Sequence, residues 1–125
     1  KPGAIAKLRA AGFTSIVDLR TKGEDTASEK EAAESAGLRY FNISVTILPT
    51  DFQIAEFARI IDDPKNAPFF IHSTSENQVG AMWTMYRIWE GVSPQTAFEE
   101  GRTTGLQSDS EAGIRTWLAV RTPTK

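Results

Sequence analysis

The residues best suited to chemistry lie in one short segment, from His72 to Gly80. It reads His-Ser-Thr-Ser-Glu-Asn-Gln-Val-Gly and contains the single histidine of the chain. A serine hydroxyl can act as a nucleophile where a neighbouring base takes its proton. Successive backbone amides at a helix start can instead bind phosphate or another oxyanion. The residue types therefore predict a hydrolytic site or an oxyanion-binding loop.

The flanking patterns place this segment at the edge of a sheet. Residues 67–71 form an apolar run ending at His72, typical of a central parallel strand. The following stretch, 79–90, is apolar almost all round, which predicts a largely buried helix starting near Val79. In parallel sheets, ligands bind outside the carboxyl ends of the strands, so this turn is the predicted site.

The rest of the chain alternates between helical and strand-like patterns. We expect helices over 2–11 and 28–36, the second opened by the Ser-x-x-Glu capping box at Ser28, and buried strands over 14–19 and 38–45. Further helices are expected to begin after Thr50, Ser93 and Ser108. This order predicts one α/β domain over residues 1–125, with a central parallel sheet flanked by helices on both faces.

Composition excludes several functions. The 14 basic and 16 acidic side chains give a net charge of −2, so we expect no nucleic-acid or membrane partner. The absence of cysteine excludes a thiolate nucleophile, and a single histidine excludes a multi-histidine metal site. We see no carboxylate cluster, so we expect no metal and no cofactor. No apolar run reaches about 18 residues and no signal-peptide pattern is visible, so a soluble chain is expected, with the cytoplasm slightly favoured.

The segment strand-His72-loop-helix resembles the strand-His-Cys-loop-Arg-helix signature of protein tyrosine and dual-specificity phosphatases. More closely, the chain resembles the bacterial phosphatase-like family named after beta-lactamase-hydrolase-like proteins. That family's loop is one residue shorter, roughly His-Cys-x-Ser-Gly-Asn-Arg followed by Gly-Ala. Residues 11–20 (Ala-Gly-Phe-Thr-Ser-Ile-Val-Asp-Leu-Arg) and 91–94 (Gly-Val-Ser-Pro) agree with it too. The resemblance runs from Ile5 to Leu118 and implies the cysteine-phosphatase architecture.

Carried over by position, the resemblance assigns the loop residues. His72 matches the histidine before the nucleophile, and four more positions match loop or helix residues: Ser75, Asn77, Gly80 and Ala81. Three positions depart from the family: Ser73 replaces the cysteine nucleophile, Glu76 a glycine, and Gln78 the phosphate-binding arginine.

The departures remove the family's chemistry. A serine hydroxyl is far less acidic than a thiol, and in this scaffold the histidine ring points away from the nucleophile. Glutamine lacks the charge and planar fork of arginine, and a carboxylate at position 76 repels a dianion. The general acid is expected just after the strand over 38–45, but Thr46 and Ile47 stand there. Asp51 is the nearest candidate, although its first interpretation is a helix cap.

These losses predict a pseudophosphatase. An active phosphate-ester hydrolase with a non-cysteine nucleophile is an alternative, as is an oxyanion or phospho-residue binding module. The expected partner is an unidentified protein or a phosphorylated ligand, contacted through the loop residues His72, Thr74, Ser75, Glu76, Asn77, Val79 and Gly80. The scaffold usually has one or two strands before the first helix. We therefore expect a missing preceding segment or an open sheet edge that permits homo-oligomers.

Structural interpretations stand beside the functional ones. His72 is expected to be a core histidine that satisfies backbone carbonyls, and residues 73–75 to be ordinary loop and helix-capping residues. Arg20 is expected at the surface or in a cap before any anion contact. Aromatic side chains at helical spacing (Trp83, Tyr86, Trp89) are expected to pack in the core or against a neighbouring helix. A run of acidic side chains is expected to be solvated: Glu24, Asp25, Glu29, Glu31 and Glu34.

Overall fold

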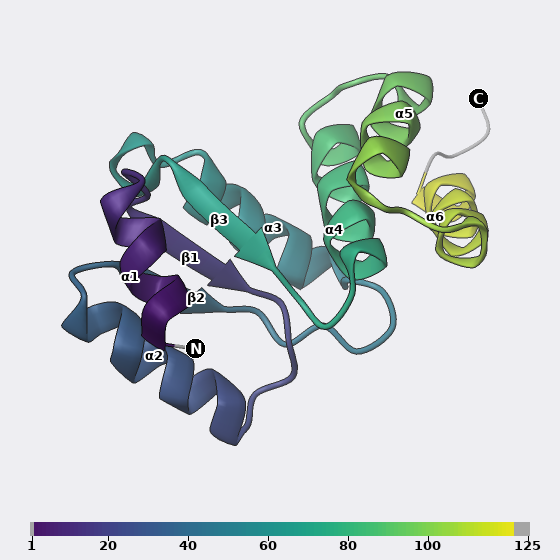
Figure 1. Ribbon diagram of the computed structural model, residues 1–125. Coiled ribbons are helices and arrows are strands. Elements are labelled where there is room, and N and C mark those ends of the chain that lie inside the picture. The colour runs from purple at the N-terminus through teal and green to yellow at the C-terminus, as the bar shows by residue number, and fades with distance from the viewer. Residues whose placement is uncertain (1, 122–125) are drawn as a thin grey trace.

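The computed structural model describes residues 2–121. It contains six α-helices, a 3₁₀ turn and three short strands (Figure 1). In chain order they are α1 (Pro2–Ala10), β1 (Ser15–Asp18), α2 (Glu24–Ser35), β2 (Arg39–Asn42), α3 (Asp51–Ile61), η1 (Pro64–Asn66), β3 (Phe69–His72), α4 (Glu76–Trp89), α5 (Pro94–Thr104) and α6 (Ser108–Arg121). None of the helices within residues 2–121 combines the length and apolarity needed to cross a membrane.

The three strands form a parallel sheet in the order β2-β1-β3. The central strand is therefore β1, whose four residues are all buried, and β3 is an edge strand whose residues are half-buried. The prediction that residues 67–72 form the central strand is wrong. An apolar run satisfies an edge strand equally well when helices cover both faces of the sheet.

Helices cover both faces of the sheet, as expected (Figure 1). Along β1, side chains alternate between the faces. Ile16 packs with Ile5 of α1 and Ala33 of α2. Val17 packs on the other face in a cluster with Phe57 of α3 and with Met82 and Tyr86 of α4.

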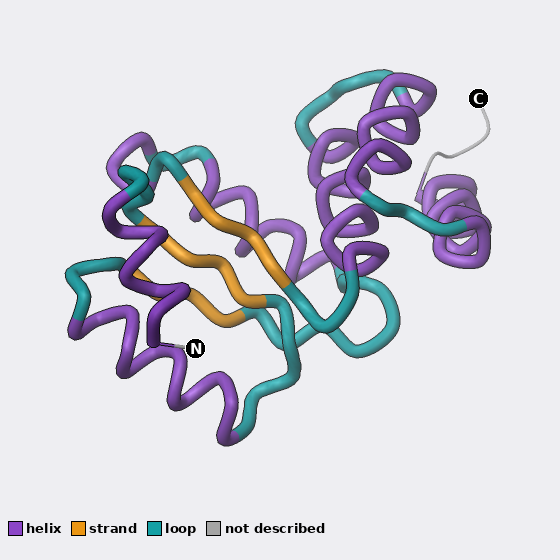
Figure 2. The backbone as a smooth tube through the Cα atoms, viewed as in Figure 1, coloured by secondary structure: helices purple, strands orange, loops and turns teal. Residues whose placement is uncertain are grey.

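The last three helices form a second packed group at one end of the sheet (Figures 1 and 2). Its core contains Ile54, Ala81, Met85, Phe98, Leu106 and Ile114. Two glycines let α4 and α5 approach closely. A Cβ at Gly80 would lie 2.7 Å from the amide nitrogen of Leu106, and one at Gly101 would lie 1.9 Å from Thr84 Oγ1. This packing fixes the position of the helix that follows the predicted site.

Several element boundaries differ from the prediction. Helix α2 starts four residues before Ser28, because the Thr26 hydroxyl accepts the Gly23 amide and donates to the Gly23 carbonyl. The capping box at Thr50 and Gln53 is confirmed, with both reciprocal hydrogen bonds formed. The predicted buried strand over 38–45 is reduced to β2, a partly exposed edge strand. The predicted starts of α5 and α6 are confirmed.

Candidate functional site

Strand β3 leads through residues 73–75 into α4, as Figure 2 shows. Ser75 is the N-cap of the helix, and its hydroxyl accepts a hydrogen bond from the Gln78 amide at 3.4 Å. The helix therefore begins at Glu76, three residues before the predicted start near Val79. Glu76 and Gln78 belong to the first helical turn rather than to a loop.

The two positions that differ most in chemistry from an active phosphatase loop are bonded to each other. The Ser73 hydroxyl donates a hydrogen bond to Oε1 of Gln78. A neutral amide oxygen is not a base, so this contact orients the hydroxyl without activating it. The His72 ring bonds to Glu29 instead of to Ser73. Within residues 2–121, the geometry supplies Ser73 with no base.

Asn77 attaches the start of α4 to the end of the chain. Its side-chain nitrogen donates to the Ser110 hydroxyl at 2.8 Å, and its oxygen accepts the Gln107 amide at 2.7 Å. The side chain thus bridges to both the α5–α6 turn and α6. These two bonds hold the helix start in place.

A cleft of about 300 Å³ lies beside the segment. Its apolar walls include Phe70, Ile71 and Val79, and its polar rim includes Ser73 and Glu76; His72, Ser75 and Thr104 complete the lining. Of the residues that line this cleft in the described part of the chain, one carries a carboxylate and none is a lysine or an arginine. The cleft therefore offers no side-chain charge to attract a phosphoryl group.

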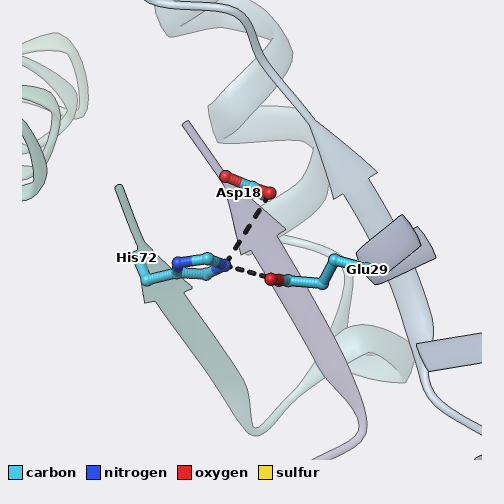
Figure 3. Close-up of side chains that lie close together, drawn as sticks. All are labelled: Asp18, Glu29 and His72. Carbon is cyan, nitrogen blue, oxygen red and sulfur yellow. Dashed lines mark hydrogen bonds and ion pairs between the residues drawn. The ribbon is translucent and has the colours of Figure 1, made fainter. Parts of the chain in front are cut away.

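His72 faces away from this segment, toward α2. The parallel register places Asp18 of β1 beside His72 of β3, and both point to the face that α2 covers. Nε2 of His72 lies 2.5 Å from Oε2 of Glu29 and 3.8 Å from Oδ2 of Asp18 (Figure 3). The imidazole was expected to satisfy backbone carbonyls, and that prediction is wrong, because its partner is a carboxylate from another element.

Glu29 also departs from the prediction. It was expected to be solvated with the other acidic residues of its helix, but its side chain retains only 16% exposure. Because the helical position of Glu29 turns toward the sheet, the carboxylate bonds to residues 9 and 43 positions away, Arg20 and His72. No spacing in the sequence signals such a convergence.

Arg20 and Tyr40 complete the hydrogen bonding of this cluster. The Arg20 guanidinium donates to both oxygens of Asp18 and to Oε1 of Glu29, and the Tyr40 hydroxyl donates to Oδ2 of Asp18. Arg20 is thus an internal ion-pair partner rather than a cap or an anion contact. Burial raises the pKa of Asp18, but the hydrogen bonds from Arg20 and Tyr40 outweigh it, and the net shift is downward. Asp18 is a carboxylate at neutral pH.

Asp51, the predicted general-acid candidate, is hydrogen-bonded to α6. Asp51, the first residue of α3, accepts hydrogen bonds from Trp117 Nε1 at 2.8 Å and from Arg121 at 2.7 Å, both on α6. These bonds lower the pKa of Asp51. A carboxyl group that stays ionised at neutral pH cannot donate a proton to a leaving group.

The aromatic stripe of α4 packs in the core or against neighbouring helices, as expected. Trp83 and Tyr86 contact each other and are bonded to Glu100 and Asp62. Trp89 is 38% exposed, and its ring stacks with the Arg121 guanidinium of α6.

A second, larger cleft of about 450 Å³ lies between the start of α2 and the end of β2. Its polar lining is already committed in part: Ser44 accepts the Lys22 amide, and Asn42 donates to the carbonyls of Asp18 and Arg20. Both clefts lie at the carboxyl ends of strands and beside a helix start. The segment at residues 72–78 stays the candidate site, because it contains Ser73 in the predicted nucleophile position.

The fold and the segment between β3 and α4 define a domain of the protein tyrosine and dual-specificity phosphatase class. A family model described as "DSP-PTPase phosphatase fused to NAD+ Kinase" matches residues 3–121. The chain belongs to this family, which confirms the predicted phosphatase-like membership. No curated protein matches the chain.

Solved structures confirm the fold. Tk-PTP in its active form is 17% identical, with a TM-score of 0.73 over 97% of this chain and 87% of that one. A DUF442 protein from Shewanella putrefaciens CN-32 is 17% identical, with a TM-score of 0.67 over 96% and 76%. P. aeruginosa TpbA in complex with pTyr is 21% identical, with a TM-score of 0.64 over 89% and 68%. At these identities the likeness concerns the fold.

Proposed function

We propose that this phosphatase-like domain has lost catalysis and acts through binding, as a pseudophosphatase. The observation that carries the proposal is the hydrogen bond from Ser73 to Gln78. The residue in the nucleophile position and the residue in the arginine position satisfy each other, and neither is charged.

The first catalytic requirement is a nucleophile. Cysteine phosphatases use a thiolate, which exists at neutral pH because local positive charge lowers the thiol pKa. The Ser73 hydroxyl needs a base instead, and the nearest imidazole, that of His72, is bonded to Glu29 on the α2 face. Without a base, the alkoxide needed for attack on phosphorus is not formed.

The second requirement is charge stabilisation. Phosphoryl transfer depends on fixed positive groups around the equatorial oxygens, and the loss of such a group costs several powers of ten in rate. Gln78 supplies no charge, and Glu76, the first residue of α4, adds a negative one at the rim of the cleft. These residues disfavour a phosphate monoester dianion as ligand.

The partner proposed for the cleft is a protein surface or a ligand whose recognised part is not a dianion. Its apolar walls, Phe70, Ile71 and Val79, favour an apolar or aromatic group, and the rim hydroxyls of Ser73 and Ser75 offer hydrogen bonds. A phosphorylated ligand remains compatible if other parts of it provide the affinity.

The proposal is tested by hydrolysis of an aryl phosphate by the native chain and by Ser73→Ala. We expect no turnover above the buffer blank for either protein. Turnover by the native chain that Ser73→Ala abolishes would contradict the proposal and establish a serine-dependent hydrolase. Turnover that Ser73→Ala leaves unchanged would also contradict it and direct attention to another nucleophile.

A further inference from the structure

Three potential metal ligands converge outside the segment between β3 and α4. One donor atom each from Asp18 of β1, Glu29 of α2 and His72 of β3 lie within 4.8 Å of one another (Figure 3). The donors come from three different elements and from both carboxylate and imidazole chemistry. Asp18 is fully buried, and the side chains of Glu29 and His72 are 16% and 23% exposed.

We propose that Asp18, Glu29 and His72 bind a divalent transition-metal ion such as Zn²⁺. The ion would lie among Oδ2 of Asp18, Oε2 of Glu29 and Nε2 of His72, the three atoms that face one another. Ligand atoms around a tetrahedral ion, each roughly 2 Å from it, are themselves roughly 3.3 Å apart. The separations of 3.8 Å and 2.5 Å bracket that value, so side-chain adjustments of about 1 Å complete the site.

The ligand types decide which ions fit. An imidazole with two carboxylates suits Zn²⁺, Fe²⁺ or Mn²⁺, whereas Mg²⁺ and Ca²⁺ prefer oxygen ligands alone. Three protein ligands leave at least one coordination position for water or another ligand.

Arg20 limits the affinity for a cation that is expected of the site. Its guanidinium donates to Glu29 through Oε1, the oxygen that does not face His72, and it contacts both oxygens of Asp18. Such outer hydrogen bonds orient metal-binding carboxylates. Its positive charge also cancels one of the two negative charges, which weakens attraction for a cation. We therefore expect micromolar affinity for Zn²⁺ rather than the tighter binding of a closed structural site.

The proposal stands independently of the proposed function, because it concerns binding of an ion and not turnover. The chain has one histidine and no cysteine, so a single imidazole reports on metal binding without ambiguity. Nitrogen-15 NMR of the native chain is therefore followed during titration with Zn²⁺ alone. We expect a saturable shift of the Nε2 resonance of His72. In a parallel titration, Co²⁺ should broaden the signals of Asp18, Glu29 and His72 together.

A matched pair of variants on α2 separates the site from non-specific binding. Glu29→Gln is expected to weaken Zn²⁺ binding by about 10- to 100-fold, the usual effect of disturbing a metal site. Glu31→Gln, an exposed change on the same helix, should leave it unaltered. An Nε2 resonance that Zn²⁺ does not move, or equal affinity in the two variants, would overturn the proposal. If Glu29→Gln does not fold, broadening by Co²⁺ that spares Asp18 and Glu29 in the native chain would overturn it.

Discussion

Two groups of side chains meet at the carboxyl ends of β1 and β3, and they differ in charge. The segment at residues 72–78 holds its two key positions, Ser73 and Gln78 of the first turn of α4, in a neutral hydrogen bond. The neighbouring cluster pairs the Asp18 and Glu29 carboxylates with the Arg20 guanidinium and contacts the His72 imidazole. The Ser73 and Gln78 side chains are uncharged, and Glu76 is the carboxylate beside them, whereas the neighbouring cluster combines two carboxylates, a guanidinium and an imidazole.

This difference separates the groups that stabilise the fold from the groups that catalysis would need. Charged groups in the cluster satisfy one another and join β1, β3 and α2, so they stabilise the fold whether or not catalysis is present. The neutral pair satisfies local hydrogen bonding, and neither of its members carries a charge. The proposed loss of catalysis in one region is therefore compatible with an intact scaffold in the other.

The largest expected effect comes from breaking the cluster. Asp18→Asn should lower the free energy of unfolding by about 3 kcal/mol, because it removes the fully buried carboxylate that accepts hydrogen bonds from Arg20 and Tyr40 and leaves Glu29 as the remaining partner of the Arg20 guanidinium. Urea unfolding followed by circular dichroism measures the loss. The exposed change Asp25→Asn on α2 is the control and should stay within about 0.5 kcal/mol of the native chain. A loss below about 1 kcal/mol for Asp18→Asn would remove the structural role of the cluster.

The next largest effect tests the close packing of α4 against the end of α5 and the α5–α6 turn. Gly80→Ala should destabilise the domain by about 1–3 kcal/mol, since its Cβ would lie 2.7 Å from the Leu106 nitrogen and 2.9 Å from the Gly101 carbonyl oxygen. Backbone atoms cannot rotate away. Gly3→Ala, also in a helix but with open space around its Cβ, should be neutral or stabilising by up to about 1 kcal/mol. Equal melting temperatures for the two variants would contradict this close approach.

Acid should weaken the cluster before it affects the neutral pair. The pKa of Asp18 is lower in the folded chain than its ordinary value of 3.8, so its contribution to stability is complete above that pH. As pH falls further, the unfolded state takes up the proton first, and the contribution is lost through the folded pKa. Unfolding free energies measured between about pH 6 and about pH 3 should fall less steeply in Asp18→Asn than in the native chain. Parallel slopes would count against the assigned pKa shift.

The smallest effect is expected from the neutral pair itself. Ser73→Ala removes one hydrogen bond between half-buried, uncharged groups, so it should cost no more than about 1 kcal/mol. Thermal unfolding of this variant beside Asp18→Asn measures the contrast between the two regions directly. A greater loss for Ser73→Ala than for Asp18→Asn would reverse the comparison.

The sequence predicts those features that depend on neighbours along the chain. The capping box at Thr50, the Ser-Pro start of α5 and the position of the segment after β3 all follow from residues within one turn of each other. The start of α2 was misplaced because a Ser-x-x-Glu pattern at Ser28 competes with a glycine whose amide and carbonyl Thr26 satisfies. Two patterns of similar strength cannot be ranked without the packing that selects one.

The partners of His72 could not be predicted in the same way. The contact with Glu29 joins residues 43 positions apart, and it depends on which strand is central and which face α2 covers. Strand order was the part of the fold for which the sequence carried the weakest signal. Without the strand order, the side chains that lie next to His72 cannot be deduced, and so the sequence does not predict the cluster.

The most direct test of the central claim restores the missing chemistry. The triple variant Ser73→Cys, Glu76→Gly, Gln78→Arg replaces the three departures in an otherwise native chain, and aryl phosphate hydrolysis is measured beside the native protein. If the scaffold is intact and only this segment is disabled, the native chain shows no turnover and the triple variant shows measurable turnover. The double variant Ser73→Cys, Glu76→Gly, which keeps Gln78, should show none. Turnover by the native chain, or a folded triple variant that stays inactive, would contradict the account.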